Sequence, residues 1–306
     1  MGVLLEIFDP QFLSRNSVYI SLLIGFVCPL VGVYLVLRRV VFLGVALPQV
    51  SSCGIAFAFA MQGWGWIPHA HDSAEERAIA LGGSVLFTLA AILMLSVMER
   101  RERGLIEGRT GTAYVLAGAW SILLLVQNPL GEHGMLELLR GEIIAVPNTD
   151  LILTGVTFGL VVLGLIVFQK EFLLVSFDRE MAVTLKKRVI AWDTLLFTLI
   201  GLTISVAVLS VGPLVAFGFL LLPPLIAYQF AQTMRQFAVA ASVIGGVTAV
   251  LGFCIAYRRD LPVGPTDVAL LGVLYAIAFG ARKMHPRGRA PGATAVQPQA
   301  SPAKPG

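Results

Sequence analysis

Apolar stretches long enough to cross a lipid bilayer dominate this 306-residue sequence and limit what it can fold into. A spanning helix needs about 20 mostly apolar residues. About nine such stretches occur, and the sixth and seventh meet at 210–213, as a tight external hairpin or as a re-entrant dip. The predicted spans are 17–37, 40–62, 78–98, 111–127, 150–168, 192–210, 213–231, 236–257 and 267–282.

The composition agrees with a membrane protein. The chain is 57% hydrophobic and 13% charged, whereas soluble domains are about 45–50% apolar and about 25% charged. Three cysteines, Cys28, Cys53 and Cys254, lie inside apolar runs, so we expect no disulfide framework. We predict an all-α polytopic membrane protein of about nine transmembrane helices, with eight as the alternative.

The distribution of positive charge predicts the topology. With the N-terminus outside and the C-terminus cytoplasmic, most of the 22 lysine and arginine residues fall in cytoplasmic segments. Residues 1–283 then form the transmembrane domain, with a cytoplasmic segment at 170–190. The tail at 284–306 is rich in Pro, Ala and Gly and is predicted to be disordered.

Ionisable residues are absent from the middle of every predicted span. Ion-coupled carriers keep such residues near the midplane although each costs several kcal/mol there, and intramembrane hydrolases need catalytic groups there too. Both classes are disfavoured. If the chain transports a substrate, we expect its energy to come from outside the membrane domain, and we predict no catalytic residue.

The second predicted span gathers polar and small residues in one short window. Gln49 lies about 15 Å from Arg39 along a helix, near the middle of a hydrocarbon core of about 30 Å. A proline frees a backbone carbonyl, and such breaks often line cavities. The window serves either helix packing, through small and hydrogen-bonding residues, or a translocation pathway. It contains Pro48, Gln49, Ser51, Ser52, Cys53 and Gly54.

The seventh predicted span contains several helix breakers, which make a straight helix implausible. It is either a pathway or gating element or an inert kink. The breakers are Gly212, Pro213, Gly218, Pro223 and Pro224.

An external loop before the third span carries His69, His71 and Asp72, with two glutamates after them. Imidazole and carboxylate groups are ligands for transition metals. The loop is either a metal collector or an ordinary solvated loop.

The polar break at 169–188 separates two spans and is too long and too patterned to be a simple turn. Ser176 suits a helix N-cap, and Asp178 and Glu180 would lie in the first turn, where the helix dipole favours acids. Basic residues follow at 186–188. The segment is either a docking helix for a cytoplasmic protein or a basic segment on anionic lipid. A lipid-surface role does not explain Phe177, Met181 and Leu185, which we expect to be buried.

Six motifs, in order over residues 17–283, resemble the permease subunits of the ABC-3 family. Ser176-Phe177-Asp178-x-Glu180-x-Ala182 is similar to the family's S-F-D-x-E-x-A coupling segment. The other five are Val36-Leu37-Arg38-Arg39, Gly44-x-Ala46-Leu47 closed by Gly54, Gly141-Glu142-Ile143-Ile144 with Asp150-Leu151, Val211-Gly212-Pro213-Leu214 with Leu222-Pro223 and Ala227, and Leu261-Pro262-x-Gly264-Pro265-Thr266.

The resemblance implies an importer subunit of the bacterial inner membrane that binds no cofactor itself. It implies a second permease copy or paralogue, two cytoplasmic ATPases that use ATP and dock on the 172–188 segment, and an extracytoplasmic metal-binding protein. The transported substrate would be zinc, manganese or iron. Nucleic acid is not an expected partner.

Three positions depart from the family's GDALSHAALPG-like motif. Val45 replaces its aspartate, Gln49 its histidine and Cys53 its proline, and the first two are the family's expected metal contacts. A neutral amide is a poorer ligand than imidazole or carboxylate, so the ion would pass hydrated or loosely held. A permease for a non-metal small solute and a non-transporting assembly subunit are the alternatives.

Overall fold

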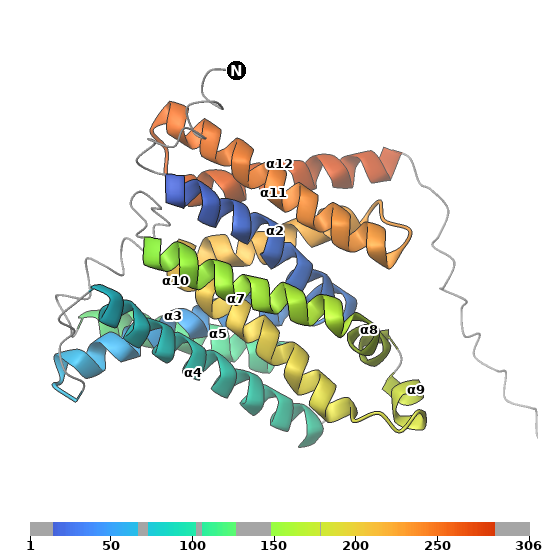
Figure 1. Cartoon of the computed structure of the whole chain (residues 1–306), viewed down its shortest axis with the longest axis horizontal. Coiled ribbons are helices and arrows are strands. Elements are labelled where there is room, and N and C mark those ends of the chain that lie inside the picture. The colour runs from blue at the N-terminus through green and yellow to red at the C-terminus, as the bar shows by residue number, and fades with distance from the viewer. Residues whose placement is uncertain (1–14, 67–72, 102–105, 127–147, 178, 285–306) are drawn as a thin grey trace, which may run out of the picture.

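The computed structural model describes residues 15–66, 73–101, 106–126, 148–177 and 179–284, which form helices and no strands. Eight of these helices are long and apolar enough to span a membrane, which confirms an all-α polytopic membrane protein (Figure 1). They are α2 (Arg15–Leu37), α3 (Val41–Gly63), α4 (Ser73–Arg101), α5 (Ile106–Val126), α7 (Asn148–Val167), α10 (Val189–Tyr228), α11 (Met234–Arg259) and α12 (Val263–Met284). Two short helices, α8 (Gln169–Phe177) and α9 (Arg179–Thr184), lie between α7 and α10. The tail beyond 284 lies outside the described residues.

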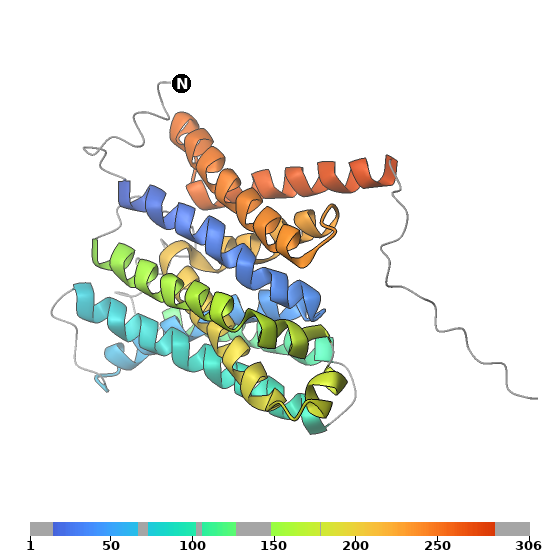
Figure 2. The ribbon, with the colours of Figure 1, turned by 45° about the vertical axis from the view of Figure 1, so that its right-hand side comes forward.

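The sixth and seventh predicted spans form one 40-residue element, α10, which is broken at Gly212. Gly212 has φ 81° and ψ 165°, which are not helical values. Glycine adopts this conformation readily, whereas residues with a Cβ rarely do. The chain turns back at this break. Asp193 pairs with Arg38 at the end of α2, and Pro224 contacts α2 at Gly32. A straight helix would separate residues 193 and 224 by about 46 Å, whereas residues 32 and 38 are about 9 Å apart along α2. Figures 1 and 2 show the two halves of α10 running back past each other.

Polar contacts place helix ends on two opposite faces of the bundle. Asn16 donates a hydrogen bond to Asn148 (2.7 Å), and Arg77 forms an ion pair with Asp150. The N-terminal ends of α2, α4 and α7 therefore lie together. The C-terminal end of α2 lies at the other face, with α8 and the start of α10. This alternation agrees with the predicted order of crossings, while the side of the membrane on which each face lies stays a prediction.

Three helices form the centre of the bundle. Within the apolar windows of α2, α3 and α10, 67–72% of the residues are buried, against 22–39% for the other spans. The outer helices leave large apolar side chains exposed, as expected of surfaces in contact with lipid or another subunit. The candidate pathway residues on α3 and α10 therefore lie in the innermost helices.

Glycines bring the central helices into backbone contact with their neighbours. Gly54 of α3 faces Gly83 of α4, and a methyl group at position 54 would overlap the Gly83 carbonyl oxygen. A methyl group at Gly32 of α2 would overlap the Leu220 carbonyl oxygen of α10 still more strongly. Without a hydrophobic driving force between helices in lipid, such close packing of small residues is a main source of association.

Candidate translocation pathway and coupling segment

Gln49 and Val45 lie on one face of α3, one helical turn apart, and both are half-buried. The residues from Val50 to Ala56 are buried against neighbouring helices. The Gln49 amide nitrogen lies 3.3 Å from where a Cβ would stand on Gly118 of α5. The absence of a side chain at Gly118 therefore makes room for the Gln49 amide between α3 and α5.

Ser51 belongs to a buried group of hydroxyls that joins three helices. Its oxygen lies 2.6 Å from the Ser84 hydroxyl of α4. Ser84 donates to the Ser205 carbonyl of α10 (3.4 Å), and the Ser205 hydroxyl donates to Thr88 (3.2 Å). Interhelical hydrogen bonds of this kind hold membrane helices together. Ser51 thus has a packing role in this structure.

The neighbours of Ser51 are equally enclosed. Pro48, Ser52 and Cys53 are buried within α3. None of the three faces an open channel in this conformation, so their assignment to the pathway remains a prediction.

The break in α10 is anchored to α7. Ser210 donates to the Val206 carbonyl (2.9 Å), and its oxygen lies 3.2 Å from the Thr154 hydroxyl. Pro213 follows Gly212 directly and lacks the N–H that a continuous helix would use. The break therefore has a defined position beside α7, and Pro223 is buried farther along the returning half.

The coupling segment differs from the single capped helix predicted from sequence. It forms α8 and α9, and Ser176 lies inside α8 instead of capping a helix. Phe172 and Val175 of α8 and Ala182 of α9 are buried at 0%, 5% and 0% exposure. Asp178 lies outside the described residues, and Glu180 is described only as part of the α9 backbone.

An aromatic cluster holds α8 against the bundle. Phe172 packs edge-on against Tyr34 of α2 (ring centroids 6.1 Å apart) and against Trp192 of α10 (6.2 Å). Phe168 lies 5.3 Å from Trp192. Such pairs each contribute about 0.5–1.5 kcal/mol beyond area burial, so α8 is fixed to the ends of α2 and α10.

The outer side of the coupling segment is apolar and open. Phe177, Met181 and Leu185 are 61%, 53% and 54% exposed, so the expectation that they are buried was wrong. They follow one another at four-residue spacing and are followed by exposed basic residues at 186–188. We call these three exposed apolar side chains the stripe; the basic residues that follow them in the chain add positive charge, and together they suit contact with a partner.

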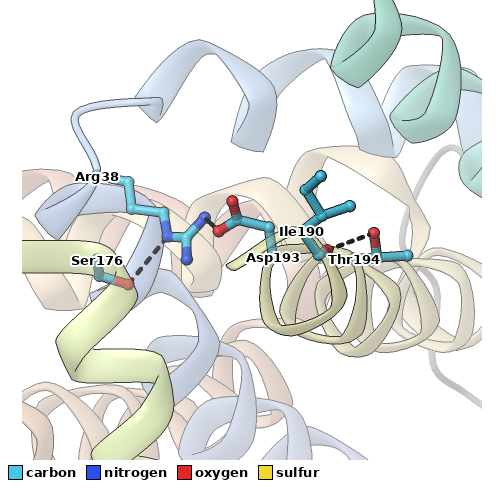
Figure 3. A network of polar contacts seen from close by, with 5 residues as sticks. All are labelled: Arg38, Ser176, Ile190, Asp193 and Thr194. Atoms are coloured by element: carbon cyan, nitrogen blue, oxygen red, sulfur yellow. Dashed lines mark hydrogen bonds and ion pairs between the residues drawn. The ribbon is translucent and has the colours of Figure 1, made fainter. Parts of the chain in front are cut away.

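Arg38 joins the coupling segment to two membrane helices (Figure 3). Its Nε donates to the Ser176 hydroxyl (2.9 Å), and its Nη1 lies 2.7 Å from Asp193 Oδ1 in an ion pair. Its guanidinium carbon lies 5.2 Å from the centre of the Phe197 ring, which is cation–π distance. The charged side chains are 11% and 17% exposed. Nothing in the local sequence could have identified this contact with Ser176, since the two residues are 138 positions apart.

Sequence reasoning also missed the surroundings of two carboxylates within the helices, one partly buried and one fully buried. Asp193 lies in the first turns of α10, and Asp267 is the fifth residue of α12 and 0% exposed. Neither oxygen of Asp267 has a hydrogen-bond partner in the structure, and the carboxylate packs against Gly252 of α11. The sequence prediction concerned the middle of each span, and both carboxylates stand near the beginning of theirs.

The described residues contain no group of three or more His, Cys, Asp or Glu side chains placed to hold a metal ion. The candidate metal residues His69, His71 and Asp72 lie outside the described part of the chain, as do residues 141–144 of the third motif. The metal-collector hypothesis for the 69–72 loop therefore stays a prediction.

A bundle of membrane-length helices, with a broken helix at its centre and a folded segment at one end, defines a multi-pass membrane protein of the permease class. The chain belongs to the ABC 3 transport family, whose family model matches residues 11–282. The match covers the whole bundle, from before α2 to the last turn of α12. It confirms the resemblance seen in the motifs and an inner-membrane location in bacteria.

Several relatives are similar over nearly their full length. A Haemophilus influenzae protein named as an iron transport system membrane protein is 24% identical, over 91% of this chain and 93% of its own. The manganese transport system membrane protein MntD of Bacillus subtilis is 26% identical, over 85% and 88%. The structure of PsaBC from Streptococcus pneumoniae in complex with Fab is 23% identical, with a TM-score of 0.76, and covers 91% of this chain and 94% of that one. This last likeness shows the shared fold.

Proposed function

We propose that this chain is the permease subunit of an ATP-driven importer for a divalent transition metal ion, zinc, manganese or iron. The observation that carries the proposal is the coupling segment. Its inner face is packed onto α2 and α10 through Phe172 and Ala182, while its outer face exposes Phe177, Met181 and Leu185. A segment that is packed against the bundle through some apolar side chains and exposes others is suited to bind a partner at that end of the bundle.

The family and the names of its members support metal as the substrate. The relatives described above are named for iron and manganese transport. Their similarity extends over the full bundle, so the whole permease is matched and not one region of it. The oligomer we propose contains a second permease copy or paralogue, two cytoplasmic ATPases and an extracytoplasmic metal-binding protein.

Translocation in this proposal passes beside Gln49. ATP hydrolysis on the partner moves α8 and α9, and these displace the ends of α2 and α10 to which they are packed. The break at Gly212 belongs to α10, and the polar amide at Gln49 belongs to α3, which follows α2 in the chain, so the movement reaches both. Because a neutral amide is a weak ligand for these metals, the ion crosses this level hydrated or loosely held. The energy for the step comes from the partner subunit, and this chain performs no chemistry.

Loss of the two acidic residues of the coupling segment tests the proposal. In proteoliposomes that contain the full chain with its ATPases, Asp178→Ala combined with Glu180→Ala is expected to abolish ATP-dependent Mn²⁺, Zn²⁺ and Fe²⁺ uptake. Protein insertion and abundance should remain unchanged. Intact coupled uptake in this double variant would refute the role of the segment.

A permease of the same fold for a non-metal small solute is the second candidate. It is favoured by the lack of a three-ligand metal group among the described residues, and by Gln49 and Val45 at the expected ligand positions. If an assembled wild-type complex hydrolyses ATP but takes up none of the three metals, the result favours a non-metal solute as the substrate.

A further inference from the structure

Arg38 occupies a junction between three segments of the bundle. It follows the last residue of α2, and three positions later α3 begins at Val41. Arg39, between them, has φ 57° and so forms the tight turn that links the two helices. Any displacement of Arg38 is therefore transmitted directly to the start of α3, which carries Gln49 two turns farther along.

The two polar partners of Arg38 come from different segments. Ser176 is the penultimate residue of α8, which precedes α9, and Asp193 lies in the first turns of α10. Figure 3 shows the guanidinium between them, with Nε directed at the hydroxyl and Nη1 at the carboxylate. One side chain thus contacts the coupling segment and the broken helix at the same time.

This arrangement holds the two partners in a fixed geometry. A guanidinium is planar and presents its N–H groups in a rigid fork. The pair is also largely shielded from water, so its attraction is screened less than that of a surface pair. Loss of one partner would leave a buried charge without compensation, which is strongly destabilising.

The neighbouring arginine gives a direct comparison. Arg39 is exposed, and Arg38 is half-buried. Both are at the same end of α2 and carry the same charge, so they contribute alike to the charge bias that orients the chain. Only Arg38 contacts α8 and α10 in the described structure.

We infer that Arg38 is a positioning residue that couples movement of the α8–α9 segment to both central helices, α3 and α10. The inference rests on the proposed function, because it needs a partner that moves the segment. The aromatic cluster packs α8 against α2 and α10, while the Arg38 contacts fix their relative register by directed bonds. Without the Arg38 contacts, α8 can still bind a partner but no longer displaces α3 and α10 together.

The test is the number of metal ions taken up per ATP hydrolysed. Full-length chain and its ATPases are reconstituted in proteoliposomes, and Mn²⁺ uptake is measured together with phosphate release. Arg38→Gln is expected to lower the ratio by about tenfold, within the range of measured coupling energies between sites. Ser176→Ala, which removes only the bond to α8, should lower it by about fivefold. Arg39→Gln is the matched control and should stay within about twofold of wild type.

Each result decides the inference. A lowered ratio for Arg38→Gln and Ser176→Ala in complexes that still contain the ATPase supports it, since a purely structural defect would reduce uptake and hydrolysis together. A wild-type ratio in both variants overturns it. If Arg38→Gln fails to assemble, Ser176→Ala decides by the same criterion. Failure of the wild-type complex to take up any metal with ATP would instead refute the proposed function.

Discussion

Replacing Asp267 by asparagine is expected to stabilise the protein. The carboxylate is 0% exposed, about 6 Å along α12 from its first residue, and neither oxygen accepts a hydrogen bond in the structure. In such a site the group stays charged without a partner or takes up a proton. Either state costs free energy on folding, as an uncompensated charge or as uptake of a proton at neutral pH. A neutral amide of nearly the same shape removes that part of the cost, although the amide is itself a buried polar group.

The size of the effect follows from the cost of an unsatisfied buried group. Mutational series place that cost at about 1–3 kcal/mol, and higher for charges. Asparagine still bears the cost of a neutral group, so we expect Asp267→Asn to raise the free energy of unfolding only by the excess that belongs to the charge, about 1–3 kcal/mol. With a shift of about 2–4 °C for each kcal/mol in proteins of this size range, the midpoint should rise by about 2–12 °C.

The protein carries its own reporter for this measurement. Cys28 and Cys53 are free and buried, so they react with a thiol-specific fluorescent dye only when the bundle opens. The midpoint of that reaction on heating gives the stability of the full chain in detergent. Asp260→Asn is the matched control, because Asp260 is exposed at the end of α11 in the left-handed conformation that asparagine also adopts. Its midpoint should change by no more than about 2 °C, since surface substitutions stay within about 0.5 kcal/mol.

A lower midpoint for Asp267→Asn would refute the reasoning. It would show that the carboxylate makes a favourable contact in the folded protein, such as one with a bound cation. Charge at this position would then stabilise the bundle, and the desolvation argument would be wrong.

Three further substitutions, the first with a matched control, test the packing, the pathway and the docking stripe. Gly54→Ala should lower the thermal midpoint by the equivalent of about 1–3 kcal/mol, because the new methyl overlaps the Gly83 carbonyl. Gly155→Ala on α7, which meets nothing within 4 Å, should leave the midpoint unchanged or raised. Gln49→His should increase Mn²⁺ or Zn²⁺ uptake severalfold, since imidazole is the better ligand; unchanged flux of every metal would favour a non-metal substrate. Met181→Asp should prevent co-purification of the ATPase without altering the thermal midpoint, and continued co-purification would argue against the stripe as the docking face.

The sequence predicted the spanning helices well where charged residues flank the apolar runs. The first two predicted spans, 17–37 and 40–62, correspond to α2 and α3 within one or two residues at each end. A run of this length without charge has few stable alternatives in a bilayer, because every backbone group must be satisfied within the helix. The fold class follows from that constraint alone.

The polar contacts could not be predicted in the same way. Ser176 has the local signature of an N-cap, yet its hydroxyl accepts a hydrogen bond from Arg38, which follows the last residue of α2. Asp193 and Asp267 stand near the beginnings of apolar runs, and only their tertiary neighbours decide that Asp193 is partly buried and Asp267 fully buried. Similarly, Phe177, Met181 and Leu185 are apolar but lie on the outer side of the coupling segment. Composition indicates that such residues avoid water, whereas exposure depends on which face the short helices turn toward the bundle.

The break at Gly212 has a consequence for how the chain enters the membrane during synthesis. Residues 194–227 contain no charged side chain, and the break lies in their middle. No charged connection therefore separates the two halves of α10. The insertion channel has no polar segment between them that it could translocate separately. Basic residues flank the whole stretch, at 186–188 and at Arg235, and they hold both ends on the same side. The two halves must enter the lipid together as one hairpin, so a nascent chain halted at residue 212 would lack the second anchor that orients it.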